Sequence, residues 1–405
     1  MSGKWPGGFI KETAPVVVGP TDGEGGTASG IWTLDQAADY EKQGLWPKPV
    51  LTKELYAWGK NNKGQLGLGN TTSLSSPAQV GALITWTAVS GGHEYGLGIT
   101  DGKLYAWGDG DRGKLGLGSQ TDYSSPVQVG ALTTWLKVAC GDYSTFAIKT
   151  DGTLWAWGKN FFGTLGVGNT TDYSSPVQVG SLTNWAQVGN GRGWALAVKT
   201  DGTLWSWGQN ADGVLGQGNS TNYSSPVQVG GLTDWASVHP GRNFVVATKT
   251  DGTMWSWGTN AYGCLGQNVA TSDAVLSPVQ IGALTTWSNT ASGESQTLAT
   301  KTDGTLWVWG RGSNGRLGVG NTTNYSSPIQ VGALTTWLNV SAGYTNSSAT
   351  TTGGALWSWG GNANGELGQG NTTEYSSPVQ VGALTTWAVL AKRADSSAVF
   401  ATLKY

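Results

Sequence analysis

One phrase, a tryptophan followed by a glycine at the end of a short apolar run, recurs along the whole chain. In residues 151–169 the phrase is DGTLWAWGKNFFGTLGVGN. The tryptophans of its seven copies are Trp58, Trp107, Trp157, Trp207, Trp257, Trp309 and Trp359. A period of about 50 residues is typical of solenoids and propellers rather than of separate domains. Such a chain has to bury the same apolar face once in every copy.

Each copy contains four segments with the pattern of short β-strands. In the copy that begins at Trp135 they are WLKVAC, TFAIK, LWAWG and PVQV, and an Asp-Gly turn precedes the third. Alternation in LWAWG places Trp155 and Trp157 on one face of the strand. Because two indoles cannot remain in water, we expect the neighbouring copy to cover that face. Each copy also has a tryptophan in ALTTW or a close variant: Trp86, Trp135, Trp185, Trp235, Trp287, Trp337 and Trp387.

The two ends of the repeat complement each other. The first copy begins at its third strand, ELYAWG (54–59), and the last copy stops after its second, SSAVFATLKY (396–405). Pairing these halves completes one blade and removes two exposed sheet edges. The sequence therefore predicts an all-β fold over residues 51–405: a seven-bladed β-propeller with four-stranded blades, closed by its N- and C-terminal half-blades.

Composition excludes several classes of function. The 405 residues carry a net charge of −2, so the chain has no long-range attraction for nucleic acid or an anionic membrane. The start lacks the apolar segment of a secretion signal, and no stretch approaches the ~18 apolar residues of a membrane span. Cys140 and Cys264 are too far apart for a zinc or disulfide pattern. We therefore expect no metal, no cofactor, no nucleic acid and no membrane insertion.

The repeated frame resembles a known family. W-G-x-[NG]-x-x-G-x-L-G, followed by S-P-V-Q-V, is similar to the regulator of chromosome condensation repeat over residues 54 to 405. That resemblance implies a seven-bladed propeller. Members of the family include a guanine-nucleotide exchange factor that binds chromatin, a plant UV-B photoreceptor and a secreted β-lactamase inhibitor. The fold alone does not select among these functions.

The family pattern places a histidine after the first strand, and no copy of this chain has one there. The residues at that position are Tyr95, Ser144, Trp194, Phe244, Gln296, Asn346 and Ser396. The chain also lacks a basic N-terminal tail and a long insertion, and GRGWA (191–195) is only faintly similar to the photoreceptor's Trp-Arg cluster. Its two histidines, His93 and His239, lie in different copies. We expect no catalytic residue, and nucleotide exchange stays an alternative.

The copies differ mainly in two loops. The TDGT turn and the VGALTTW link are nearly uniform, whereas the triplet after the first strand and the loop after Trp-Gly vary. In a four-stranded meander the loops between strands one and two and between strands three and four emerge together, and we call that side the variable face. The opposite side, which we call the uniform face, also receives both ends of the propeller.

Variable loops on a rigid scaffold, rich in Arg and aromatic residues, are typical of a contact surface. The predicted partner-binding residues are His93, Glu94, Tyr95, Asp142, Tyr143, Phe161, Phe162, Arg192, Trp194, Arg242, Asn243, Phe244, Tyr262, Tyr344 and Asn346. The alternative is drift in exposed loops that contact nothing.

A second candidate is a ring of tyrosines in NTTDYSSP and its relatives, which could bind sugars. The tyrosines are Tyr123, Tyr173, Tyr223, Tyr325 and Tyr375. Two copies have Leu74 and Leu276 at the matching place, which favours apolar packing over a ligand hydrogen bond. The Asn-Thr-Thr triplets are interpreted as turns.

Residues 1–50 are predicted to form an extended arm with one short helix over 34–43. Trp32, Leu34 and Trp46 are its candidate anchoring residues. The Trp-Thr-Leu…Gly-x-Trp-Pro pattern is similar to segments of structural and tail proteins of tailed bacteriophages.

That resemblance implies a virion protein made in the host cytoplasm, such as a tail fibre, tip or surface appendage. The arm would bind other virion proteins, and the propeller would meet a host-surface receptor, protein or glycan. The alternative is a soluble module that binds or inhibits a host protein. The chain has no coiled-coil heptads, and homo-oligomerisation is left open.

Overall fold

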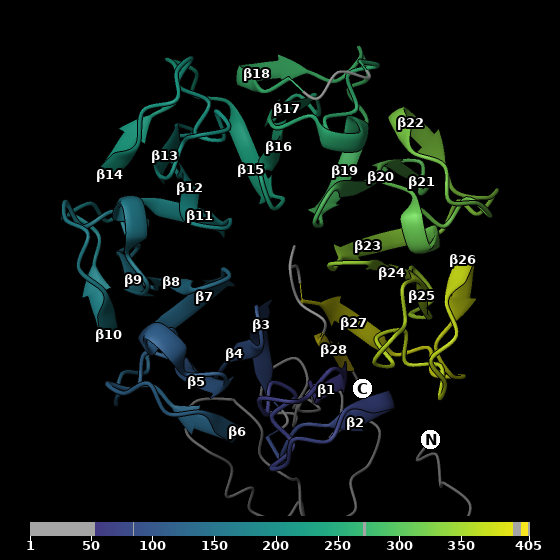
Figure 1. The fold of residues 1–405 in the computed structure, drawn as a ribbon, viewed down its shortest axis with the longest axis horizontal. Helices are drawn as coiled ribbons and strands as arrows, with labels where there is room; N and C mark the ends of the chain where they lie inside the picture. The colour runs from purple at the N-terminus through teal and green to yellow at the C-terminus, as the bar shows by residue number, and fades with distance from the viewer. Residues whose placement is uncertain (1–52, 84, 270–272, 392–397, 404–405) are drawn as a thin grey trace, which may run out of the picture. The chain divides into compact units, whose positions relative to one another are not determined.

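The computed structural model describes residues 53–83, 85–269, 273–391 and 398–403. They form seven four-stranded antiparallel sheets arranged around a central axis (Figure 1). Along the chain the elements are β1 (Leu55–Gly59), β2 (Leu74–Gln79), β3 (Trp86–Gly92), β4 (Tyr95–Thr100), β5 (Lys103–Gly108), η1 (Asp111–Gly113), β6 (Tyr123–Gln128), β7 (Trp135–Cys140), β8 (Ser144–Lys149), β9 (Leu154–Gly158), η2 (Phe161–Gly163), β10 (Tyr173–Gln178), β11 (Trp185–Asn190), β12 (Trp194–Lys199), β13 (Leu204–Gly208) and β14 (Tyr223–Gln228). They continue as β15 (Trp235–Pro240), β16 (Phe244–Lys249), β17 (Met254–Gly258), η3 (Ala261–Gly263), β18 (Val275–Gln280), β19 (Trp287–Ser292), β20 (Gln296–Lys301), β21 (Leu306–Gly310), η4 (Ser313–Gly315), β22 (Tyr325–Gln330), β23 (Trp337–Ala342), β24 (Asn346–Thr351), β25 (Leu356–Gly360), β26 (Tyr375–Gln380), β27 (Trp387–Leu390) and β28 (Ala398–Leu403).

The ring is closed by the two halves of one blade, as the sequence predicts. Its sheet has the order β2-β1-β28-β27, so the N-terminal strands complete the C-terminal pair. β1 and β28 pair antiparallel in unbroken register from Leu55↔Thr402 to Gly59↔Ala398. Phe400 then packs against Trp107 of the next blade, with ring centroids 5.7 Å apart. The prediction of a seven-bladed propeller with a composite closing blade is confirmed.

A tryptophan from the third strand of each blade locks that blade to the one before it. Trp157 of β9 is fully buried, and its indole N–H donates to the carbonyl of Lys114 in the preceding blade at 3.0 Å. Gly116 has φ +75°, and a Cβ on it would lie 2.7 Å from the Trp157 indole nitrogen. Glycine is therefore required there by both backbone conformation and space. The same donation to the preceding blade is made by Trp58, Trp107, Trp207, Trp257, Trp309 and Trp359.

The other tryptophan of the pair is covered differently. Trp155 is only half-buried, and the ammonium of Lys149 lies 3.7 Å from its ring centroid. Its indole N–H donates to the hydroxyl of Thr153 at 2.9 Å. The expectation that a neighbouring copy covers both indoles is thus correct for Trp157, whereas Trp155 is partly capped by its own blade.

The loop after Trp-Gly docks on the outer strand of the following blade. A Cβ on Gly113 would lie 2.5 Å from the Ser174 Cα, and the N–H of Gly118 donates to the Ser174 carbonyl at 2.8 Å. Tyr173 is half-buried against an apolar cluster, as predicted for packing rather than sugar binding. In one of the two copies without tyrosine, Val275 rather than the predicted Leu276 occupies this position, because Val275 pairs with Gly258. In the other copy the predicted Leu74 pairs with Gly59. The Asn-Thr-Thr triplets form turns, in which the side-chain oxygen of asparagine accepts the N–H two residues later.

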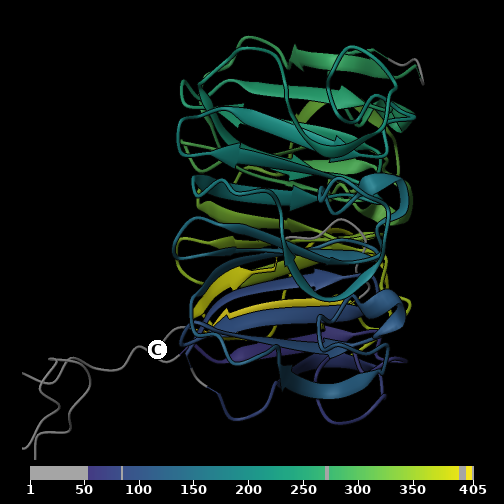
Figure 2. The same cartoon turned by 90° about the vertical axis from the view of Figure 1, so that its left-hand side faces the viewer.

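The loops separate onto two faces as the meander requires. On the variable face the N–H of Lys159 donates to the Tyr143 carbonyl at 2.8 Å, which joins a three-to-four loop to a one-to-two loop. On the uniform face the Trp135 N–H donates to Gly102 in the preceding blade at 3.0 Å. Figure 2 shows the short 3₁₀ turns of the variable face along one edge of the disc. The described end of the last strand is tied to the start of β1, where Leu403 N–H donates to Glu54 at 3.0 Å.

The uniform face exposes one leucine per blade. These side chains lie in the VGALTTW links and are 38% to 46% exposed: Leu83, Leu132, Leu182, Leu232, Leu284, Leu334 and Leu384. No helix in the part of the chain that the structure describes is long and apolar enough to cross a membrane. The compact propeller unit begins at Lys53. The predicted arm, its helix over 34–43 and the anchoring residues Trp32, Leu34 and Trp46 lie outside the described residues.

We predict that the closing blade is packed as tightly as a continuous one. Phe400→Ala and Phe146→Ala should each lower the free energy of unfolding by about 3–5 kcal/mol, because each phenylalanine is buried against the next blade's tryptophan at 5.7 Å. Leu136→Ala, at an exposed site on β7, is the control and should cost about 0.5 kcal/mol or less. Denaturant unfolding measures all three. A much smaller loss for Phe400→Ala than for Phe146→Ala would mean that the ring opens in solution.

Candidate protein-contact site on the variable face

In the six variable triplets that the structure describes, the last residue is an internal residue and not a surface residue. Tyr95, Trp194, Phe244 and Asn346 each begin a second strand and are buried. The Tyr95 hydroxyl, for example, donates to the Ser144 carbonyl of the next blade at 2.8 Å. The prediction that these four residues contact a partner is therefore wrong, because the loops before them are only two or three residues long and strand alternation turns them inward. These are also the positions where the family pattern has histidine.

Asp142 is likewise buried, and its carboxylate lies 3.8 Å from the exposed Arg192 guanidinium. Its prediction as a direct contact residue is wrong as well. The other predicted residues stay at the surface of the variable face: His93, Glu94, Tyr143, Phe161, Phe162, Arg192, Arg242, Asn243, Tyr262 and Tyr344 are exposed or half-buried. The aromatic ones include Phe161 at 57%, Tyr262 at 50% and Phe162 at 36% exposed.

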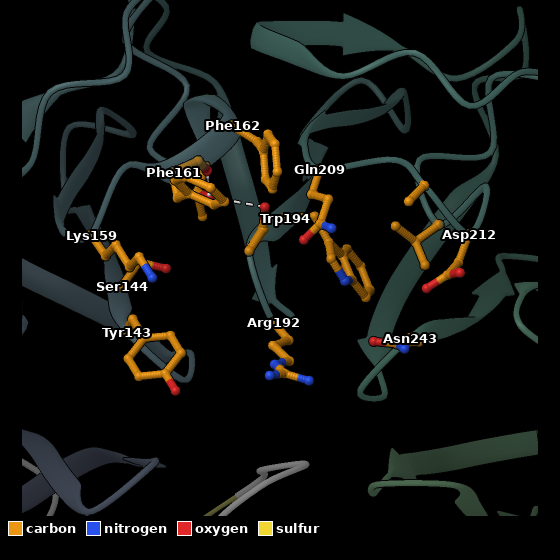
Figure 3. Close-up of a pocket in the computed structure, with 14 residues that line it drawn as sticks. Tyr143, Ser144, Lys159, Phe161, Phe162, Arg192, Trp194, Gln209, Asp212 and Asn243 are labelled. Carbon is orange, nitrogen blue, oxygen red and sulfur yellow. Dashed lines mark hydrogen bonds between the residues drawn. The ribbon is translucent and has the colours of Figure 1, made fainter.

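A cavity of about 400 Å³ opens on this face between the β7–β10 and β11–β14 blades. Trp194 and Val214 contribute apolar lining, and Phe161 and Phe162 of η2 stand at the outer end. Figure 3 shows Tyr143, Lys159 and Phe161 along one side, with Asp212 and Asn243 on the other. Gln209, Lys159 and Asp212 were not among the predicted contact residues; all three come from the loop after Trp-Gly, whose variation between copies does mark them.

The phenylalanines and a lysine form one exposed group. The ring centroids of Phe161 and Phe162 are 4.1 Å apart. The Lys159 ammonium lies 4.9 Å from the Tyr143 ring centroid and 5.1 Å from that of Phe161. Such a group combines a large apolar area with a cation held over aromatic faces. This chemistry suits a partner side chain with an apolar body and a polar end. The group offers no pair of side chains arranged for acid–base or nucleophilic catalysis.

The backbone at these aromatic residues is strained. Phe162 has φ +59° and Tyr262 has φ +61°, in the left-handed region where L-residues with a Cβ are disfavoured by roughly 1–2 kcal/mol. The corresponding residue of another blade is Asn314, with φ +59°. Asparagine is one of the few non-glycine residues that adopts this conformation readily. Neither folding nor burial therefore explains why a phenylalanine and a tyrosine stand at two of these tips.

Two pairs of charged residues lie on the variable face in the blades that precede the site. Lys114 is buried and donates to Asp109 at 2.6 Å. Burial acts to raise the pKa of Asp109, but this lysine outweighs it and holds the pKa below its usual range. At Glu94 burial likewise acts upward, and the ammonium of Lys60, at 2.6 Å, brings the pKa down. These pairs fix the loops in which they lie.

A second cavity, of about 490 Å³, is the axial channel between the first strands. Val138, Val188 and Val238 make it largely apolar. His239 lies on β15 facing this channel, within 2.9 Å of the Ser237 hydroxyl, and not in a surface loop. Among the described residues, no group of three or more His, Cys, Asp and Glu side chains is arranged to hold a metal ion.

Known families match the repeats over almost the whole propeller. The model described as RCC1-like domain matches residues 138–401, and the model described as regulator of chromosome condensation (RCC1) repeat matches residues 54–99 and 101–148. No curated protein matches the chain in sequence.

Solved structures agree with this match. The crystal structure of human WBSCR16 is similar with a TM-score of 0.78 at 21% identity, over 87% of this chain and 99% of that one. Yeast RCC1 (Prp20), solved with Kap60 bound, is similar with a TM-score of 0.77 at 19% identity, over 88% of this chain and 90% of that one. At these identities the likeness concerns the fold alone.

We predict that relieving the left-handed strain stabilises the propeller. Arg112 has φ +60°, is exposed and makes only long contacts to Asp111 and Asp172, at 3.9 and 3.8 Å. Arg112→Gly should therefore raise the free energy of unfolding by about 0.5–1 kcal/mol. Gly113→Ala is the control that introduces strain: it adds a Cβ at φ +73°, close to Ser174, and should lower the free energy of unfolding. Thermal and denaturant unfolding measure both, and a destabilised Arg112→Gly variant would contradict the strain.

Proposed function

We propose, from the premise that the chain belongs to the RCC1-like domain family, that this protein is a binding propeller without catalytic activity. Its variable face contacts a partner protein, with the cavity between the β7–β10 and β11–β14 blades at the centre of the contact. The finer part of the proposal is that the protein is a bacteriophage virion component, in which the uniform face is turned toward the particle.

The exposed Phe161–Phe162 pair is the observation that carries the contact. Two adjacent phenylalanines beside a cavity expose apolar area, and Phe162 does so from a strained backbone position. Exposed aromatic residues next to a pocket are the usual anchors of protein interfaces. Loops that drift without selection would be expected to lose such residues in favour of glycine or asparagine, which remove the strain.

The uniform face supports the proposed orientation. Its exposed leucines recur in equivalent links around the ring, so this face offers the same apolar contact at every blade. The described ends of the propeller lie on this side, and residues 1–50, which precede the propeller in the sequence, carry the proposed resemblance to bacteriophage structural and tail proteins. Attachment through the arm and the uniform face leaves the variable face pointing outward, toward a receptor of the host surface.

Two other functions compete with this proposal. Prp20p from Saccharomyces cerevisiae, a protein with binding properties to Gsp1p and histones, has a similar fold, with 20% identity and a TM-score of 0.77 over 88% of this chain and 92% of that one. Nucleotide exchange is disfavoured because the positions of the family histidine hold buried packing residues such as Tyr95 and Phe244. A soluble module that binds or inhibits a host protein uses the same variable face and differs only in not being part of a particle.

We predict that partner binding depends on the phenylalanine pair. Phe161→Ser with Phe162→Ser should reduce recovery of the cross-linked partner by at least tenfold, because both anchor side chains are lost. Leu132→Ser with Leu182→Ser is the matched control: it removes two similarly exposed apolar side chains from the opposite face of the adjoining blades. Quantitative cross-linking of the full chain, followed by mass spectrometry, measures both. Equal recovery with the phenylalanine variant, or equal loss with the leucine variant, would refute the contact face.

We predict that the chain sediments with virus particles. Mass spectrometry of gradient-purified particles should detect it at a constant ratio to the other virion proteins across the particle fractions. Deleting residues 1–50 should abolish this association while the freed propeller keeps binding its partner. Detection in the soluble lysate alone would instead support the soluble binding module.

A further inference from the structure

The cavity between the β7–β10 and β11–β14 blades contains a lysine without an opposite charge. Lys159 directly follows the Trp-Gly pair of its blade and is half-buried in the cavity wall. Its ammonium faces the rings of Tyr143 and Phe161, at 4.9 and 5.1 Å from their centroids. In the part of the chain that the structure describes, no carboxylate lies within ion-pairing distance of this ammonium. Aromatic rings therefore hold the lysine in place without neutralising it.

Three other blades carry a charged residue at the same position, and there each charge is paired. The pairs are Lys60–Glu94 at 2.6 Å, Asp109–Lys114 at 2.6 Å and Arg311–Glu294 at 3.4 Å. Of the charged residues that follow Trp-Gly in the seven blades, all of them described, Lys159 is the one that the chain leaves without an opposite charge. A half-buried ammonium gains free energy when a carboxylate joins it.

The blade pair that contains Glu94 shows where such a carboxylate fits. Tyr95 and Trp194 each begin a second strand, and each pairs with the glycine of Trp-Gly in its own blade. The residue before the strand is Glu94 in one blade and Gly193 in the other. Both residues have a positive φ, of +63° and +112°. Gly193 therefore stands toward Lys159 as Glu94 stands toward the lysine of its blade pair.

The missing side chain leaves space. Lys159 and Gly193 line the same cavity of about 400 Å³. The three atoms nearest to a Cβ built on Gly193 all belong to side chains, and the closest is Oε1 of Gln209, at 3.2 Å. No backbone atom thus blocks this place at close range. A carboxylate from another molecule has room here, beside the lysine that lacks one.

The other charges of the lining limit what can enter. Arg192 already lies 3.8 Å from the Asp142 carboxylate. Asp212 stands across the cavity from Lys159 (Figure 3), and its carboxylate forms no hydrogen bond or ion pair with the described residues. A second negative charge in the cavity would approach Asp212 and be repelled. The site therefore suits one carboxylate on an otherwise apolar segment rather than a run of acidic residues.

We propose that the cavity binds a segment of the partner protein in which one acidic side chain pairs with Lys159 beside Gly193. Apolar residues on either side of that acidic residue pack on Phe161 and Phe162. The inference rests on the proposed function and adds the chemistry of the partner. The partner's carboxylate takes the place that Glu94 fills within the chain.

The test compares two fluorescein-labelled peptides, Gly-Ser-Leu-Glu-Leu and Gly-Ser-Leu-Gln-Leu, which differ in one charge. Their binding to the purified full chain is measured by fluorescence anisotropy at low salt. The glutamate peptide should bind more tightly by about fivefold or more, because it alone forms the ion pair. Lys159→Gln should bring this ratio close to one. Lys60→Gln removes the equivalent lysine whose carboxylate lies within the chain, so it is the matched control and should keep the ratio within about twofold.

A second variant fills the site from within. Gly193→Glu places the chain's own carboxylate beside Lys159, as Glu94 lies beside Lys60. This variant should bind both peptides more weakly by about fivefold or more, because the space and the charge are already taken. It also serves as the test if Lys159→Gln does not fold.

Several results would overturn the proposal: no saturable binding of the glutamate peptide, equal binding of the two peptides, an unchanged ratio in Lys159→Gln, a ratio lost equally in Lys60→Gln, or unchanged binding by Gly193→Glu. A peptide with lysine in place of glutamate that binds more tightly than both, and loses this advantage in Asp212→Asn, would assign the cavity to a basic segment instead. None of these results affects the partner recovery measured with the phenylalanine variant, so failure of this inference and failure of the proposed function are separate outcomes.

Discussion

The propeller depends on one contact repeated around the ring: an indole that enters the preceding blade, donates its N–H to a buried carbonyl and packs on a glycine. At Trp157 the acceptor is Lys114 and the glycine is Gly116, whose positive φ and missing Cβ are both needed. The contact buries one of the largest side chains and satisfies its polar atom at once, so it is worth more than apolar area alone. Because it acts between blades rather than within one, no blade is complete without its neighbour, and closing the ring leaves none without a neighbour.

Residues that hold one blade to the next and residues at the exposed loop tips therefore differ in how freely they vary. The tryptophans, the glycines after them and the serines of the outer strand hold blade to blade, and they recur in almost every copy. In the two loops of the variable face the exposed tips take little part in these contacts, whereas the glycines and carbonyls of the loop after Trp-Gly, such as Lys114 and Gly116, hold the next blade. The residue at which the second strand begins is also internal. There the side chain turns into the interface, which accommodates Tyr95, Trp194, Phe244 or Asn346 because each fills the space differently. Variation between copies therefore marks two classes of position: exposed tips and adaptable internal packing.

Much of the architecture could be predicted from sequence because the period, the alternation in LWAWG and the split repeat each have one physical solution. Sequence variation between the seven copies was a poorer guide to which single side chains are exposed. It selected Phe161, Phe162 and Tyr262 correctly as exposed, but also Trp194 and Phe244, which lie one residue inside the strand. The Val275 register was missed because a longer loop precedes it. The ion pairs of Glu294 could not be predicted from the sequence. Arg311 and Arg316 are distant in sequence from Arg242, and only the packing of two blades brings the three arginines around one carboxylate.

A rigid ring also changes what a loop substitution costs. The exposed tips of the variable face take little part in the contacts that tie the blades, so substitutions at tips on separate blades are expected to act independently on stability. Strain at Phe162 or Tyr262 is then a local cost of about 1 kcal/mol, which the surrounding contacts absorb without loss of the fold. The same independence lets one sector become aromatic, at the β7–β10 blade, while the blade three positions further on carries Glu294 with its paired arginines. A partner that spans both sectors would be recognised by the distance between them as well as by their chemistry, and that distance is set by the ring.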